Sequence, residues 1–105
     1  EKGQFDLAIA DYNRALEIDP TDLMVLANRA NAYAAKGDFD KAIADYTKAV
    51  EVNPKDFKVY HDLGLTYVNK GDFDKAIYYF NKTLEVNPDA INDGQFHNDR
   101  AVAYF

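Results

Sequence analysis

The chain has 105 residues, of which 48% are hydrophobic, so it is long enough for one small domain with a packed core. Its formal net charge of -6 argues against nucleic acid and anionic membrane surfaces as partners, because both attract clustered Lys and Arg. The chain has no cysteine, which excludes disulfides and thiolate zinc sites.

The first residues do not resemble a targeting segment. The chain opens with Glu1-Lys2-Gly3-Gln4 and has no initiator Met, so we expect a piece cut from something longer. No apolar run approaches the roughly 18 residues needed to span a bilayer. A soluble, cytoplasmic location is slightly favoured, and the compartment is otherwise left open.

A 34-residue repeat organises the whole chain. The segment from Lys36 to Ile43 recurs unchanged from Lys70 to Ile77. Four residue types keep the same spacing, as Gly3, Gly37 and Gly71; Phe5, Phe39 and Phe73; Ala8, Ala42 and Ala76; and Pro20, Pro54 and Pro88. A generic helical bundle needs no such fixed phase, so the pattern predicts repeats that stack to close a shared core.

The first segment, residues 1–22, predicts a turn at Gly3 followed by one helix over about residues 5–18. Its phase matches the second helix of a repeat, which we name helix B.

The segment 23–56 predicts a complete repeat of two helices, A and then B. Leu26, Ala30 and Tyr33 are spaced by four and three residues, so they share one face of helix A. The same spacing gives helix B an apolar face, formed by Phe39, Ala42, Ile43, Tyr46, Ala49 and Val50.

Helix-capping and helix-ending residues mark the ends of these helices. Gly37 suits the left-handed position after a helix, and Asp38 then follows as an N-cap. Pro54 ends helix B because proline disfavours helical geometry in the residue before it. Asp22 and Asp56 are placed to cap the A helices.

The segment 57–90 repeats the A–B pair, and 91–105 predicts a further helix A over about residues 94–105. Pro88 precedes Arg100 by 12 residues, whereas Pro54 precedes Leu63 by 9. This difference predicts a three-residue insertion within Asp89–Asn92, with Asp93 as the next N-cap. The whole pattern predicts an all-α fold of six helices, in the order B, A-B, A-B, A, without strands.

The repeat resembles the tetratricopeptide repeat (TPR), whose 34-residue pattern is Trp-x2-Leu-Gly-x2-Tyr, then Ala-x3-Phe, then Pro. The segment 57–90 matches it, with Tyr in place of Trp, at Tyr60, Leu63, Gly64, Tyr67, Ala76, Phe80 and Pro88. In the preceding repeat, Arg29 stands where Leu is usual. The resemblance covers the chain and implies a single array over 1–105, built as a right-handed α-α superhelix.

Catalytic and metal-binding chemistry finds little support in the sequence. There is no Cys or Ser, and no Thr lies in a motif with a nearby His base. His61 and Asp62 are adjacent, so on a helix they point about 100° apart and cannot easily share an ion. We therefore predict no enzyme activity, no cofactor and no metal site.

The resemblance implies a protein-binding scaffold, because the A helices of TPR arrays line a concave groove that receives a peptide or partner helix. The residues expected on that face are Asn28, Asn31, Lys58, His61, Asp62, Leu65, Asn69, Asn98, Asp99 and Val102. Asn suits such a face because its amide can both donate to and accept from a peptide backbone. The alternative for each residue is that it is only the polar side of an amphipathic helix.

Two specialised TPR sites do not match. The clamp with which TPR co-chaperones hold the carboxylate tail of heat-shock chaperones needs cations where this chain has Ala27, Gln95 and Asp99. The asparagine ladder of glycosyltransferase-linked TPRs needs Asn at 28, 62 and 99, and only Asn28 fits. Asp62 and Asp99 favour a cationic or neutral ligand.

The second hypothesis is self-assembly through the ends of the chain. The first helix B lacks its own helix A, and the last helix A lacks its own helix B, so each is expected to expose part of an apolar face. The residues expected there are Phe5, Ile9, Tyr12 and Leu16 at one end and Ala101, Tyr104 and Phe105 at the other. Head-to-tail contact between copies would make a homo-oligomer.

Overall fold

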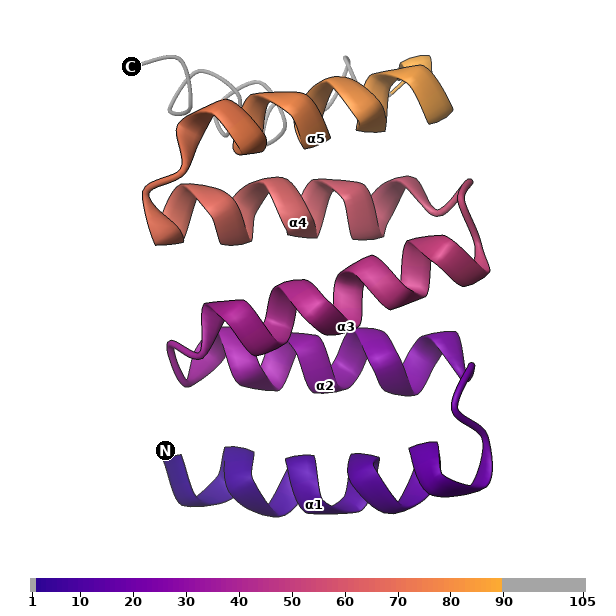
Figure 1. The fold of residues 1–105 in the computed structure, drawn as a ribbon, viewed down its shortest axis with the longest axis vertical. Helices are drawn as coiled ribbons and strands as arrows, with labels where there is room; N and C mark the ends of the chain where they lie inside the picture. The colour runs from indigo at the N-terminus through magenta and orange to yellow at the C-terminus, as the bar shows by residue number, and fades with distance from the viewer. Residues whose placement is uncertain (1, 90–105) are drawn as a thin grey trace. The chain divides into compact units, whose positions relative to one another are not determined.

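The computed structural model describes residues 2–89, and its contacts divide the chain into two compact units, Glu1–Asn53 (unit 1) and Pro54–Phe105 (unit 2). Five α-helices and no strand occur in residues 2–89 (Figure 1). They are α1 (Lys2–Ile18), α2 (Leu23–Ala35), α3 (Phe39–Val52), α4 (Phe57–Lys70) and α5 (Phe73–Val86). The all-α prediction is therefore confirmed for this part of the chain. The predicted sixth helix, over 94–105, lies outside it.

Unit 1 places α2 between α1 and α3, and successive helices run in opposite directions (Figure 1). Small residues let α2 and α3 approach closely, because Ala30, Ala42 and Ala49 are fully buried where the helices meet. Leu26 and Tyr46 fill the space that these alanines leave. The core of unit 1 thus follows the apolar faces that the spacing predicts.

Unit 2 is the antiparallel pair of α4 and α5. Its core centres on Phe80, Leu63 and Ala76, all fully buried. Gly64 is required there, because a Cβ atom at this position would lie 2.4 Å from Cε1 of Phe80. The missing side chain of Gly64 therefore makes room for the phenyl ring.

The structure confirms most of the residues that were predicted to cap or end the helices. Gly37 and Gly71 have left-handed backbones, with φ of 86° and 90°, where α2 and α4 end. The carboxylates of Asp22 and Asp56 accept hydrogen bonds from the backbone N–H groups of Val25 and Val59, which caps α2 and α4. Asp38 occupies the N-cap position of α3 without a side-chain capping bond, and its carboxylate lies 3.8 Å from Nζ of Lys41 instead.

The predicted turn at Gly3 is wrong. Helix α1 begins at Lys2 and continues through Gly3. The physical difference lies in the next residue, because Gln4 stands where the other two turns have Asp38 and Asp72. Asp strongly favours the N-cap, whereas Gln is a good former of helix interiors, so the helix is not interrupted here.

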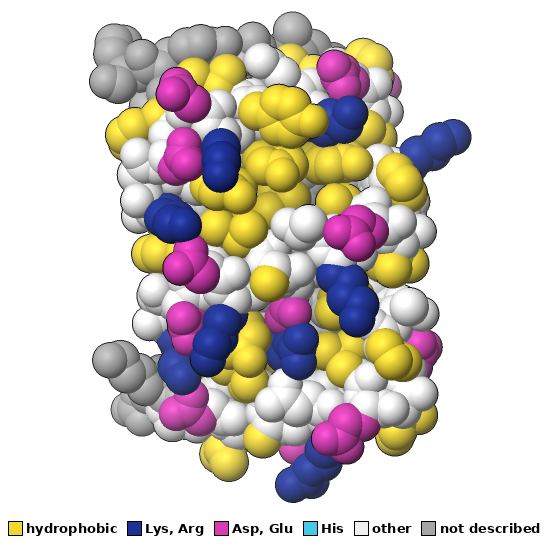
Figure 2. Space-filling model, in the orientation of Figure 1, with side chains coloured by type: hydrophobic (Ala, Val, Ile, Leu, Met, Phe, Trp, Pro, Cys, Tyr) yellow, Lys and Arg dark blue, Asp and Glu magenta, His cyan; other side chains and the backbone are white. Residues whose placement is uncertain are grey.

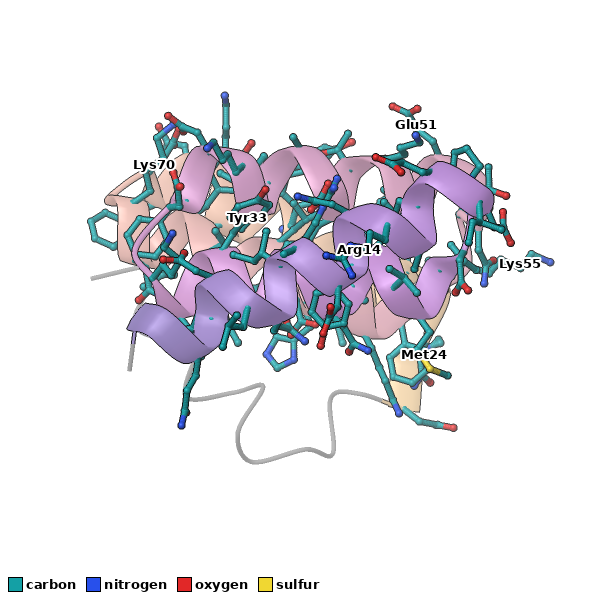
Figure 3. All side chains as sticks on the ribbon, turned by 90° about the horizontal axis from the view of Figure 1, so that it is seen from below. Arg14, Met24, Tyr33, Glu51, Lys55 and Lys70 are labelled. Atoms are coloured by element: carbon teal, nitrogen blue, oxygen red, sulfur yellow. The ribbon has the colours of Figure 1, made fainter. Side chains whose placement is uncertain are left out.

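The apolar face expected on α1 is also only partly exposed. Ile9 is 8% exposed and belongs to the core of unit 1, while Phe5, Tyr12 and Leu16 are half-buried. Because α1 packs on α2, this face is turned largely toward its neighbour. The strongly exposed apolar residues of α1 are Leu7 and Ile18. Met24, at the start of α2, is also strongly exposed and is labelled in Figure 3.

Candidate functional site

The predicted binding face of unit 1 lies on α2. Asn28 and Asn31 are both exposed and stand one helical turn apart, so they share a face. The buried Tyr46 of α3 donates its hydroxyl hydrogen to Oδ1 of Asn31. This bond fixes the orientation of the Asn31 amide and leaves its N–H donors for other partners. Asn28 offers a whole amide at the surface.

The predicted binding face of unit 2 lies on α4. Lys58 and Asn69 are exposed near its two ends, and His61, Asp62 and Leu65 are half-buried between them. The imidazole of His61 meets the ring of Phe80 edge-on, with 5.6 Å between the ring centroids. His61 is therefore held against the core of unit 2, whereas Lys58 and Asn69 remain accessible to a ligand.

Asp62 is the electrostatic feature of the α4 face. Its carboxylate makes no hydrogen bond or ion pair within residues 2–89. Burial raises the pKa of Asp62, and the negative charge of Asp56 raises it further, against the opposing influence of His61 and Lys58. A desolvated carboxylate without a partner attracts hydrogen-bond donors and cations, and it repels anions.

The remaining predicted site residues fall outside the described part of the chain. These are Asn98, Asp99 and Val102 of the binding face and Ala101, Tyr104 and Phe105 of the association surface. The structure therefore brings the predicted residues together in two groups, one on α2 and one on α4, each within its own unit.

Two other kinds of site were sought among residues 2–89. No group of His, Asp or Glu side chains there could hold a metal ion. No helix in that range combines the length and apolar character needed to cross a membrane.

Sequence reasoning missed a polar cluster that joins the three helices of unit 1. Arg29 on α2 donates from Nε and Nη2 to the two carboxylate oxygens of Asp45 on α3, both at 2.7 Å. It also donates from Nη1 to Oδ1 of Asn13 on α1, again at 2.7 Å. The hydrogen bond to Asp45 raises the pKa of Arg29. Arg29 stood out in the sequence as a departure from Leu, and its partner could have been found by asking which buried position of helix B is acidic.

Sequence reasoning also left the tyrosines of unit 2 unconnected. The ring of Tyr79 on α5 stacks on that of Tyr67 on α4, with centroids 5.5 Å apart and an interplanar angle of 3°. Tyr60 also stacks on the ring of Tyr79, with 6.4 Å between the ring centroids, and Tyr78 meets the ring of Tyr79 edge-on at 5.0 Å. Four tyrosines thus form one cluster across α4 and α5.

Comparison with known proteins identifies the repeat. Residues 1–37 and 30–71 match the family described as "TPR repeat", and residues 57–90 match the family described as "Tetratricopeptide repeat". No curated protein matches the chain in sequence.

Solved structures of similar fold cover nearly the whole chain. The first TPR domain of Spaghetti (RPAP3), solved bound to the HSP90 peptide SRMEEVD, is 26% identical, with a TM-score of 0.87 over 97% of this chain and 79% of that one. The Sgt2 TPR domain from Aspergillus fumigatus is 29% identical, with a TM-score of 0.86 over 97% and 67%. The second TPR domain of human RPAP3 shares the fold at 23% identity, with a TM-score of 0.86 over 98% and 83%. The chain therefore belongs to the tetratricopeptide-repeat family and holds about three repeats in its 105 residues.

Proposed function

We propose that the chain is a scaffold that binds an extended segment of a partner protein through the polar faces of α2 and α4. The observation that carries this proposal is the exposure of Asn28, Lys58 and Asn69 on helices whose opposite sides are buried in the core. Within residues 2–89 these side chains make no hydrogen bond or ion pair, so they are available to a ligand. Amide and ammonium groups at such positions can bond the backbone and side chains of a peptide.

The similar structures support a peptide as the ligand. The Spaghetti domain was solved with the HSP90 peptide SRMEEVD, and the human domain with the HSP70 peptide SGPTIEEVD. Both peptides end in two glutamates, a valine and an aspartate, so they are strongly acidic. A TPR fold of this size is therefore compatible with binding a short extended segment.

The chemistry of the α4 face favours a different ligand for this chain. Asp62 is a desolvated carboxylate without a partner in the described residues, and it would repel the acidic end of such peptides. Ala27 stands where the co-chaperone clamp has a lysine. We therefore propose that the partner segment is neutral or basic where it meets Asp62.

Binding to a peptide array tests this proposal. The array would hold SRMEEVD, the same peptide with both glutamates changed to glutamine, and the same peptide with both changed to lysine. We expect the lysine peptide to bind most tightly and SRMEEVD most weakly. The double variant Asn28→Ala/Asp62→Ala should lose this preference, whereas Lys48→Ala/Glu51→Ala, at exposed positions of α3, should keep it.

Two outcomes would count against the groove proposal. One is tightest binding of SRMEEVD, and the other is unchanged affinity of the Asn28→Ala/Asp62→Ala variant for every bound peptide. Circular dichroism of each variant establishes that the helices are retained.

Head-to-tail association through the chain ends stays an alternative prediction. Within the described residues its N-terminal surface is reduced, because Ile9 is buried. Sedimentation over a concentration series tests it directly, and a strictly monomeric chain at high concentration would rule it out.

A further inference from the structure

A pocket opens on unit 2 beside the stacked tyrosines. Tyr67, Asp74, Lys75, Tyr78 and Tyr79 line this space of about 490 Å³ between α4 and α5. Figure 2 shows hydrophobic side chains gathered over these two helices. We name the five lining residues the tyrosine pocket. It differs from the proposed peptide-binding face, because none of its residues belongs to that predicted set.

The rings give the tyrosine pocket two aromatic walls at right angles. Tyr67 and Tyr79 are parallel within 3°, and the ring of Tyr78 is turned by 89° from that of Tyr79. Tyr78 is 60% exposed, so much of its ring faces solvent. The face of an aromatic ring carries negative potential and attracts cations.

The charges in the lining leave a carboxylate available. Nζ of Lys75 lies over the ring of Tyr67, 5.5 Å from its centroid, and 4.0 Å from a carboxylate oxygen of Asp72. The one cation of the lining is therefore already engaged within unit 2. Asp74 is exposed and forms no ion pair in residues 2–89. The unmatched charge of the tyrosine pocket is negative.

Comparison with the preceding repeat shows which contacts of the tyrosine pocket both repeats share. Thirty-four residues earlier, Lys41 lies over Tyr33 at 5.6 Å, so the contact between lysine and tyrosine recurs and belongs to the repeat itself. The positions of Tyr78 and Tyr79 are held there by Ala44 and Asp45. A repeat can thus fold without the second aromatic wall, so the repeat pattern itself does not require the ring of Tyr78.

We propose that the tyrosine pocket binds an arginine side chain of a partner protein. A planar guanidinium can lie flat against the exposed ring of Tyr78 while its N–H groups donate to the carboxylate of Asp74. An ammonium can make the first contact, but it lacks the flat, forked shape that uses both groups together. Asp74 and Tyr78 lie on helix B of their repeat, so the tyrosine pocket would be a second place at which the scaffold meets a partner.

Titration of the full 105-residue chain, followed by NMR of the tyrosine rings, tests the proposal. The probes are capped tripeptides, Gly-X-Gly, in which X is arginine, lysine, citrulline or glutamate. Citrulline keeps the planar shape of arginine but carries no charge. We expect the ring signals of Tyr78 and Tyr79 to shift most with arginine, less with lysine, and little with citrulline or glutamate.

Two variants and a matched control localise the effect. Tyr78→Ala copies Ala44 of the preceding repeat, and Asp74→Asn removes only the charge, so both should keep the fold. Each should weaken arginine binding about five-fold, which corresponds to roughly 1 kcal/mol for an exposed cation–aromatic contact. Asp40→Asn, the equivalent change in the preceding repeat, should leave it unchanged.

Three results would overturn the proposal. Equal shifts with arginine and citrulline would show that charge is not recognised. Unchanged affinity in both Tyr78→Ala and Asp74→Asn would place the contact elsewhere. Stronger shifts with the glutamate probe would identify Lys75 as the binding group.

Discussion

The helix pairs α2–α3 and α4–α5 have the same 34-residue phase, yet they join their helices with different chemistry. In the first pair, Arg29 and Asp45 form an ion pair with both N···O distances at 2.7 Å. In the second pair the equivalent residues are Leu63, which is fully buried, and Tyr79, which stacks on Tyr67. The repeat therefore specifies where side chains meet without specifying how they attract one another.

The ion pair of the first helix pair and the aromatic stack of the second need different neighbouring groups. A part-buried ion pair is favourable when its remaining polar groups also find partners, and Arg29 makes a third hydrogen bond, to Asn13 on α1. The aromatic pair needs only close contact with other rings, which α4 and α5 supply between them. The polar solution thus involves three helices, and the apolar solution involves two.

The largest difference should appear when each repeat loses its tyrosine at the shared position. Tyr67→Ala should cost about 3–5 kcal/mol, because Tyr67 is 7% exposed and stacks on Tyr79. Tyr33→Ala should cost less, since Tyr33 is half-buried and its described partners are the cations of Arg29 and Lys41. Denaturant titration of both variants measures the difference. A loss below about 1 kcal/mol for Tyr67→Ala would show that the ring is not part of the core.

Exchanging the chemistry of one repeat for that of the other tests the comparison most directly. Arg29→Leu alone should cost about 3 kcal/mol, near the lower end expected for breaking a buried pair, because Asp45 stays behind at 8% side-chain exposure. Arg29→Leu/Asp45→Tyr installs the residues of the second repeat and should recover most of this loss. Denaturant titration of the single and double variants gives the coupling energy. A double variant no more stable than Arg29→Leu would show that the two solutions are not interchangeable.

Exchanging the small residue at the shared position should destabilise both repeats, but for different reasons. Gly64→Ala places a methyl group against the ring of Phe80 and should cost about 1–3 kcal/mol through overpacking. Ala30→Gly, the equivalent position, should cost about 1 kcal/mol through helix propensity. Adding Phe80→Leu to each background identifies the cause, because only the Gly64→Ala defect should be partly relieved. If Phe80→Leu changes the free energy of unfolding by the same amount in both backgrounds, a clash at Gly64 is excluded.

The smallest expected effect concerns the polar faces, where Asp62 corresponds to Asn28. Burial raises the pKa of Asp62 from its ordinary value of 3.8, so the folded chain binds more protons than the unfolded chain between these two pKa values. Stability contributed by this group therefore falls as pH rises through that window. Asp62→Asn should stabilise the chain at neutral pH, and the gain should vanish as pH falls below 3.8. A gain independent of pH, in thermal melts across this range, would trace the effect to packing instead.

Local signals allowed the helices and their ends to be predicted. Gly37 and Pro54 act on their own backbone, so their effect can be read without knowing the fold. Gly3 shows the limit of that approach, because the glycine keeps its phase while Gln4 replaces the capping Asp, and the helix runs on. The recurrence of one residue does not guarantee the recurrence of a turn that needs two.

Contacts between helices were harder to predict. Arg29 was recognised as unusual, but Asp45 lies 16 residues away on another helix, and its burial is set by how α3 faces α2. Ile9 was expected on an exposed face because the pattern gives the apolar side of α1 but not how much of it α2 covers. The exposure of Asn28, Lys58 and Asn69 could be predicted, because the polar side of an amphipathic helix follows from its spacing, while their role in binding stays a prediction.

The unlike junctions of the two repeats have a consequence for how the chain finds its partners while folding. Helices α3 and α5 begin with the same residues, from Phe39 to Ile43 and from Phe73 to Ile77, so each could begin to pair with the wrong A helix. An exchanged pairing would bring Arg29 against Tyr79 without a carboxylate, and would bury Asp45 against Leu63. Both errors leave a charge without its counterpart, which is strongly unfavourable. The ion pair of Arg29 and Asp45 would therefore disfavour an exchanged pairing of two helices that begin with the same five residues.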